Sequence, residues 1–214
     1  MIKEIIEQPN KNHKSSGKFS ISGINGCWRK KYLQLKGLYK EEFDERTFRI
    51  FKIGDTFHRI ICGELLTKSE NTNLKVVAME VDLPEQEHIS GRVDIIMSNS
   101  STRELIVIDV KSCGDYTLKM ISEGNCPENY VNQVLLYCHF LKLKRGFLLF
   151  FGKHKGELEE YEVLYDKDKA EKLVAEIENF YINYVDKNIL PEKCGGGKWG
   201  CEVCEKEDKF WNRK

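Results

Sequence analysis

The stretch that decides the fold is residues 88–112, HISGRVDIIMSNSSTRELIVIDVKS. Its two halves carry the apolar patterns of strands, and the polar segment 98–103 separates them as a turn. This predicts an antiparallel hairpin. Asp94 and Asp109 lie within Val and Ile runs, and burying a lone carboxylate is costly, so each needs a partner. Pairing across the turn brings the two acids together, and two carboxylates at one place favour a divalent cation.

Lys111 adds a cation to this group. It stands two residues after Asp109 on the same strand, so both side chains point to one face. A hard cation held by the carboxylates would polarise a phosphodiester oxygen and activate a water, while Lys111 orients that water and stabilises the developing charge. The alternative is a structural interior ion pair, and on these residues alone both interpretations stay open.

The segments on either side of the hairpin predict helices and further strands. Upstream, helices are expected from Cys27 toward Leu35 and from Glu45 to Leu66, the second because apolar residues recur at helical spacing, and a strand at 74–83. Downstream, the pattern favours a helix at 129–143, strands at 145–152 and 157–165, and a long amphipathic helix at 166–188. This order predicts an α/β protein in which helices flank a central sheet.

Composition limits the classes of function. The 214 residues carry 34 basic and 34 acidic side chains, so no global positive field attracts nucleic acid and any DNA site must be local. No stretch is long and apolar enough for a membrane helix or signal peptide, so we expect a cytoplasmic protein without membrane partners. Basic residues do cluster early, interleaved with aromatics that either stack on bases or pack inward: Lys11, Lys14, Lys18, Trp28, Arg29, Lys30, Lys31, Tyr32, Lys36, Tyr39 and Lys40.

Val93-Asp94 followed by Asp109-Val110-Lys111 resembles the signature of the PD-(D/E)XK nuclease superfamily, with valine in place of the usual proline. The resemblance implies a nuclease core built on a central mixed sheet flanked by helices. RecB-like nucleases of this superfamily also carry a helix histidine ahead of the acidic strands, and His58 occupies that place. The match implies that magnesium or manganese is held by His58, Asp94, Asp109 and the Val110 carbonyl, with Lys111 assisting the attacking water.

Gln133 and Tyr137 are four residues apart, so they share one face of the predicted helix. They are either ordinary polar positions or the Gln-x-x-x-Tyr motif of RecB-like nucleases, which they resemble. That motif implies that both residues face the site and orient the lysine and the DNA backbone. Together with His58, Gly91-x-x-Asp94 and Asp109-x-Lys111, four motifs then follow one another in the family's order.

The eight cysteines favour a metal centre over disulfides in a reducing compartment. Cys194, Cys201 and Cys204 lie in CGGGKWGCEVC, and Cys27 resembles the isolated N-terminal cysteine of the iron-sulfur branch of RecB-like exonucleases. That branch includes the CRISPR adaptation exonucleases and their phage relatives, and it implies a 4Fe-4S cluster. Here the third cysteine precedes the Cys-x-x-Cys pair instead of following it, so structural zinc remains the alternative. We expect Cys62, Cys113, Cys126 and Cys138 to be ordinary thiols.

The combined expectation is a metal-dependent DNA exonuclease that prefers single strands. The alternatives are a structure- or end-specific endonuclease and a non-catalytic DNA-binding assembly subunit. The resemblance also implies partners in CRISPR adaptation or recombination. We expect one RecB-like domain over 1–214, with a catalytic core at 45–165 and cysteine-bearing elements at 20–44 and 189–214 joined by the metal centre.

Overall fold

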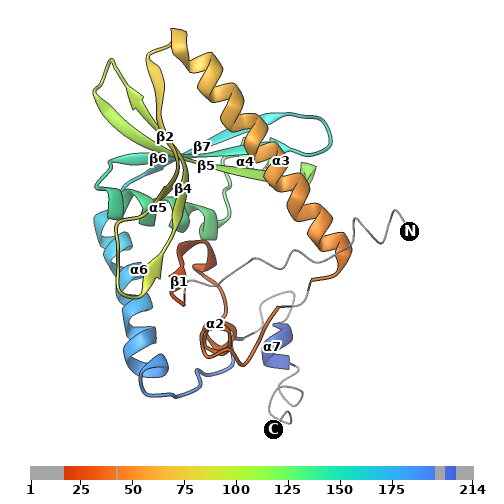
Figure 1. Cartoon of the computed structure of the whole chain (residues 1–214), viewed down its shortest axis with the longest axis vertical. Coiled ribbons are helices and arrows are strands. Elements are labelled where there is room, and N and C mark those ends of the chain that lie inside the picture. Colours follow the sequence, from red (N-terminus) through yellow and green to blue (C-terminus); the bar gives the residue numbers. More distant parts are fainter. Residues whose placement is uncertain (1–16, 42, 196–200, 206–214) are drawn as a thin grey trace.

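A twisted five-stranded sheet forms the centre of the molecule (Figure 1). A computed structural model describes residues 17–41, 43–195 and 201–205. The strand order is β2-β4-β5-β6-β7, and only β5 and β6 run parallel, so the sheet is mixed. The strands are β2 (Leu74–Asp82), β4 (Arg92–Asn99), β5 (Glu104–Cys113), β6 (Arg145–Gly152) and β7 (Leu158–Leu164).

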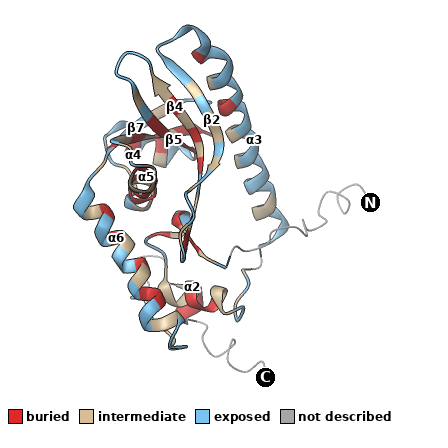
Figure 2. Ribbon diagram, turned by 60° about the vertical axis from the view of Figure 1, so that its left-hand side comes forward, coloured by how far each residue is buried: buried red, intermediate tan, exposed pale blue. Residues whose placement is uncertain are grey.

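Helices cover both faces of this sheet. The long α3 (Glu45–Lys68) packs Ile61 and Cys62 on one face, against Ile106 and Ile108 of β5. On the other face, α5 (Glu128–Leu141) and α6 (Lys167–Phe180) bury residues that pack with Val107. Successive β5 residues thus point into opposite cores, and Figure 2 shows the buried positions concentrated between the layers.

The remaining elements lie mostly at the lower end of Figure 1. They include α2 (Trp28–Leu35) and the short α7 (Glu202–Glu205), which contact each other, and β1 (Phe19–Ser20), which pairs in parallel with β3 (Ile89–Ser90). Tyr32, Leu33 and Val203 join the core that α5 and α6 build. None of the helices in the described ranges is long and apolar enough to cross a membrane.

Most predicted elements match the structure, with three differences. The segment predicted as one strand over 88–97 splits into β3 and β4 at Gly91. The last helix continues past Phe180 as a π-helical turn, Tyr181–Val185. The third difference is α4 (Asp115–Ser122), which was not predicted because it buries only Leu118 and Ile121, too few positions to reveal a helical period.

The early aromatic residues pack inward, as one of the two interpretations had it. Trp28 lies between Phe19 and Phe180, with ring centroids 5.4 and 4.8 Å away, and Tyr32 is buried. Lys36 donates to the Val185 carbonyl. Lys11 and Lys14 lie outside the described residues. The aromatic residues of α2 therefore belong to the core and are not a base-stacking surface.

Gly146 marks the closest approach of β6 to its neighbours. A Cβ atom there would stand 2.4 Å from Val107 Cγ2 and 2.6 Å from Val134 Cγ1, so even a methyl group overpacks the core. We expect Gly146→Ala to lower the free energy of unfolding by about 1–3 kcal/mol.

Gly63, within α3, is the matched control. A Cβ atom there would meet no other atom within 4 Å, so Gly63→Ala should stabilise the helix by about 0.5–1 kcal/mol. Thermal unfolding of both variants measures the contrast, and equal melting temperatures would contradict it.

Candidate active site

A cavity of about 1090 Å³ opens between α3, the sheet and α5. Its lining includes every residue of the predicted catalytic set, namely His58, Asp94, Asp109, Val110, Lys111, Gln133 and Tyr137. These residues come from α3, β4, β5 and α5, so the fold brings four separate motifs to one place. Their chemical roles remain predictions, while their proximity is a property of the structure.

The cavity lies where the β4–β5 ladder ends. The ladder runs from Asn99 opposite Glu104 to Ile95 opposite Ile108, and extending this register by one residue puts Asp94 opposite Asp109. At that point the Asp94 side chain takes over from the backbone, because its Oδ2 accepts the Val110 N–H at 2.7 Å. The Asp94 carboxylate thus takes the place of a backbone acceptor where the ladder ends, and it keeps the two acids side by side.

Asp109 is the most deeply buried charged residue of the site, at 1% exposure. Gln133 Nε2 donates to its Oδ1 at 3.1 Å, and the Lys111 ammonium lies 2.6 Å from its Oδ2. The contact with Lys111 is a short ion pair, so Lys111 supplies the positive partner of Oδ2. Burial, reinforced by the Asp94 charge and opposed by Lys111, raises the pKa of Asp109 to about 6.

A hydrogen-bonded chain fixes the helix side of the cavity. Gln133 Nε2 also donates to the Tyr137 hydroxyl at 2.8 Å, and that hydroxyl donates to the Arg92 carbonyl at 2.9 Å. Burial raises the pKa of Tyr137, which keeps its hydroxyl protonated as a donor. A Cβ atom on Gly91 would stand 3.3 Å from the Tyr137 ring and 2.9 Å from the end of the Leu83 side chain, so glycine lets the strand approach this chain closely. The Gly91-x-x-Asp94 spacing thus has a packing reason.

His58 faces the acids from the other wall. Its Nε2 lies 2.7 Å from Asp94 Oδ2, and its Nδ1 lies 3.7 Å from both Glu80 Oε1 and the Cys62 sulfur. The hydrogen bond to Asp94 raises the pKa of His58, although burial opposes the shift. The imidazole is therefore oriented toward the carboxylates and available to a cation that displaces its proton.

Glu80 is a site residue that the sequence interpretation missed. Ligand atoms of His58, Glu80 and Asp94 all lie within 4.8 Å of one another. Met79 pairs with Ile95 and Val81 with Val93, a register that places Glu80 opposite Asp94. Its φ of 52° is the left-handed conformation, which is rare for a residue in a strand and is often found at functional sites. In the sequence, Glu80 looks like any outward-facing charge of an alternating strand.

The donor set suits a hard or borderline divalent cation. Carboxylate oxygens and one imidazole are ligands that magnesium and manganese accept. The buried Asp109 carboxylate gives independent support, because Gln133 and Lys111 compensate its charge only in part and a cation beside it would lower the remaining cost. His58, Glu80 and Asp94 form the compact group, and Asp109 lies outside it, held by Gln133 and Lys111.

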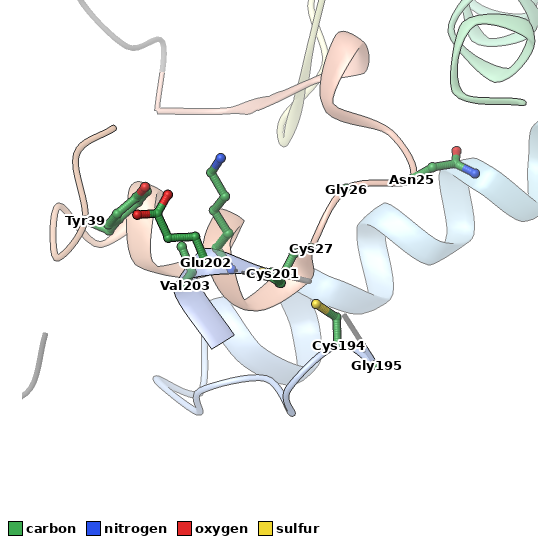
Figure 3. A pocket seen from close by; sticks show the side chains of 10 residues that line it. Asn25, Gly26, Cys27, Tyr39, Cys194, Gly195, Cys201, Glu202 and Val203 are labelled. Carbon is green, nitrogen blue, oxygen red and sulfur yellow. Dashed lines mark hydrogen bonds between the residues drawn. The ribbon is translucent and has the colours of Figure 1, made fainter. Parts of the chain in front are cut away.

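The predicted cysteine group also assembles, at a second pocket that shares no lining residue with the cavity. Figure 3 shows three of its members, Cys27, Cys194 and Cys201. The sulfurs of Cys27, Cys194, Cys201 and Cys204 all lie within 4.8 Å of one another. Cys27 is the N-cap of α2, where its sulfur accepts the Lys30 N–H at 3.4 Å. Burial raises the pKa of the Cys27 thiol to about 12, so a cation is needed to hold it as a thiolate. The arrangement is consistent with a metal centre that joins α2 to the C-terminal segment.

A short path connects this group to the cavity. Asn25, two residues before Cys27, accepts a hydrogen bond at 2.9 Å from Asn132, which is 1% exposed. Asn132 directly precedes Gln133 on α5, and the same N-terminal segment supplies Ser20 and Ser22 to the cavity wall. The cysteine group therefore anchors the loop that closes one side of the candidate active site.

No protein-family model matches the chain, and no curated protein matches it. Among solved structures, LHK-Exo in complex with dAMP is similar with a TM-score of 0.61 and 12% identity, over 80% of this chain and 89% of that one. LHK-Exo, an alkaline exonuclease from Laribacter hongkongensis, was also solved separately; that structure has a TM-score of 0.50 and 11% identity, over 80% and 93% of the chains. SSO0001 is similar with a TM-score of 0.54 and 22% identity, over 86% and 87%.

These similarities extend over most of each chain, and they show a shared fold. The expected fold class is confirmed, since a mixed sheet flanked by helices is the architecture that this chain shares with these solved structures.

Asp109 gives a test of the buried carboxylate. Its pKa is raised from 3.8 to about 6, so the ionised form destabilises the fold above pH 6, and the penalty fades as pH falls toward 4. We expect Asp109→Asn, without added divalent metal, to melt about 2–6 °C higher than wild type at pH 8 and equally near pH 4. Manganese should raise the melting temperature of wild type more than that of the variant, which keeps His58, Glu80 and Asp94 but lacks the Asp109 charge.

The matched control is Asp82→Asn, which removes an exposed carboxylate whose pKa the Arg92 contact lowers. This variant should gain no stability at pH 8. A metal-free Asp109→Asn protein that melts below wild type at pH 8 would show that the carboxylate is not strained by its burial.

Proposed function

We propose that this chain is a metal-dependent DNA exonuclease that hydrolyses phosphodiester bonds and prefers single-stranded DNA. The observation that carries the proposal is the convergence of the acid–lysine hairpin, His58 and the Gln133–Tyr137 pair in one cavity. The fold shared with an alkaline exonuclease supports it, as does that enzyme's structure with dAMP, a deoxynucleoside monophosphate of the kind that exonucleases release.

The cation would be held by His58, Asp94, Asp109 and the Val110 carbonyl, with Glu80 of β2 beside them. The bound ion supplies Lewis-acid polarisation of the phosphodiester and a water of lowered pKa. Lys111, placed beside Asp109, orients the attacking water and stabilises negative charge on the phosphate oxygens. Gln133 holds Asp109 in place through one oxygen, which leaves the other oxygen to the ion and Lys111.

Lys111 gives the sharpest test. Removing its ammonium should lower kcat on a labelled single strand with manganese by at least about 100-fold, because charge that develops on the phosphate loses its partner. Lys111→Ala and Asp109→Ala should both stay folded by circular dichroism. Lys119→Ala, which removes an exposed lysine of α4, is the control and should cut like wild type. Undiminished cutting by the Lys111 variant would refute the assignment.

Two assays distinguish the proposed exonuclease from an endonuclease and from a non-catalytic DNA-binding subunit. An endonuclease cuts circular single-stranded DNA, whereas an exonuclease requires an end, so circular and linearised forms of one strand separate the two. A DNA-binding assembly subunit would shift the strand in a gel with manganese or with EDTA and never shorten it. The expected partners in CRISPR adaptation or recombination rest on the sequence resemblance alone.

For the cysteine centre we favour a single tetrahedral ion, zinc. The sulfur of Cys204 lies 3.6 Å from those of Cys27 and Cys194. Four thiolates at 2.3 Å from one zinc stand about 3.8 Å apart. In the 4Fe-4S cluster that the resemblance implies, each thiolate binds a different iron, so the sulfurs stand farther apart. The observed spacing therefore fits one ion better than four.

Anaerobic purification followed by metal analysis decides between the two centres. We expect a colourless protein with one zinc per chain, and Cys201→Ser should lose that metal and melt at a lower temperature. Cys126→Ser, which changes a cysteine outside the group, should retain it. A brown protein with four irons per chain would overturn the zinc assignment and leave the nuclease proposal untouched.

A further inference from the structure

One face of α3 connects the acid site to an apolar surface. Ile50, Phe51, Gly54, Asp55 and His58 all line the cavity, and their spacing of three and four residues puts them on one side of the helix. At 1.5 Å per residue, the seven steps from Phe51 to His58 span about 10.5 Å along the helix axis. The cavity therefore runs from the candidate metal ligands to a hydrophobic rim within one or two helical turns.

The hydrophobic rim consists of Ile50 and Phe51, which are apolar but lie outside the protein core. Ile50 and Phe51 are 42% and 45% exposed, and the only buried residues of α3 are Ile61 and Cys62, in its C-terminal half. Figure 1 shows the N-terminal half of α3 extending past the sheet, and Figure 2 shows it without buried positions. Phe51 packs edge-to-face against Phe43 and Phe48, with ring centroids 5.0 and 6.5 Å away, so its ring is supported from behind.

The charges around the rim suit a polyanion. Besides His58, the cavity lining has four acidic and four basic side chains, so a bound divalent ion would make it net positive. The acids are Asp55, Glu80, Asp94 and Asp109, and the bases are Arg59, Arg92, Lys111 and Lys153. The adjacent turns of α3 add Arg46, Arg49 and Lys52, all exposed. A two-fold contact between copies would bring these same arginines together, which disfavours a second chain as the occupant. A nucleic acid strand offers both the negative backbone and flat apolar bases.

We propose that Ile50 and Phe51 form a stacking platform for unpaired bases of the strand whose phosphate lies in the acid site. This inference rests on the proposed nuclease function and names how that site selects its substrate. The distance of about 10.5 Å corresponds to about three base steps of 3.4 Å. A duplex keeps its bases stacked on one another inside the helix, so only a single strand gains from the platform, and it does so whatever its sequence.

Binding measurements test the platform separately from catalysis. A fluorescent 12-nucleotide single strand is titrated with each protein in calcium, and its anisotropy gives Kd. We expect Phe51→Ala to raise Kd about 5- to 150-fold, the range for loss of one base–aromatic stack, and Phe51→Tyr to restore it. Ile53→Ala is the matched control, because Ile53 is 47% exposed on the same helix but does not line the cavity.

A strand of abasic residues with the same phosphates identifies what the ring contacts. Wild type and Phe51→Ala should bind this strand equally weakly, since neither finds a base to stack on. An undiminished advantage of wild type on the abasic strand would overturn the inference, and so would equal Kd values for Phe51→Ala and Ile53→Ala on the normal strand. A wild-type dimer that Phe51→Ala converts to a monomer in light scattering would assign the surface to self-association instead. Absence of manganese-dependent cutting by wild type would refute the nuclease proposal and leave these binding results to stand alone.

Discussion

The hydrogen bond from the Val110 N–H to the Asp94 carboxylate is the contact on which the rest of the site depends. It ends the β4–β5 ladder and replaces a backbone acceptor by a charged side chain. Because β5 continues beyond this point in parallel pairing with β6, Asp109 and Lys111 stay in regular strand geometry and share one face. The same carboxylate meets His58 from α3. One side chain thus fixes the register of the hairpin and the position of the helix that closes the cavity.

The second constraint is the cost of burying Asp109. A carboxylate at 1% exposure is tolerated because Gln133 and Lys111 each approach one of its oxygens. That compensation is incomplete, as the raised pKa of Asp109 shows. In the proposed enzyme, a divalent cation bound beside Asp109 would relieve the remaining electrostatic strain, so part of the stability lost by burying the carboxylate would return as metal affinity.

The features that depend on strong local sequence patterns were predicted correctly. The hairpin, the strands at 145–152 and 157–165 and the helix around Gln133 follow from hydrophobic periodicity, and chain order selected the site residues from them. Features that depend on tertiary geometry were not predicted from the sequence. Glu80 enters the site only because the β2–β4 register and a left-handed backbone turn it toward His58. The cysteine set was predictable from composition, but the spacing between sulfurs, which bears on the identity of the metal, exists only in three dimensions.

The floor and the N-terminal wall of the cavity are held by the same core. The floor is a sheet whose central strand β5 is buried on both faces, so its acids are held firmly in place. The wall formed by Ser20 and Ser22 belongs to a segment whose residues Phe19, Ile21 and Ile24 are buried in the core that α5 also joins. The hydrogen bond from Asn132 to Asn25 adds a polar contact between this segment and α5, next to the residue that donates to Asp109. In the proposed enzyme, a metal bound by the cysteine group two residues beyond Asn25 would add to the rigidity of this wall.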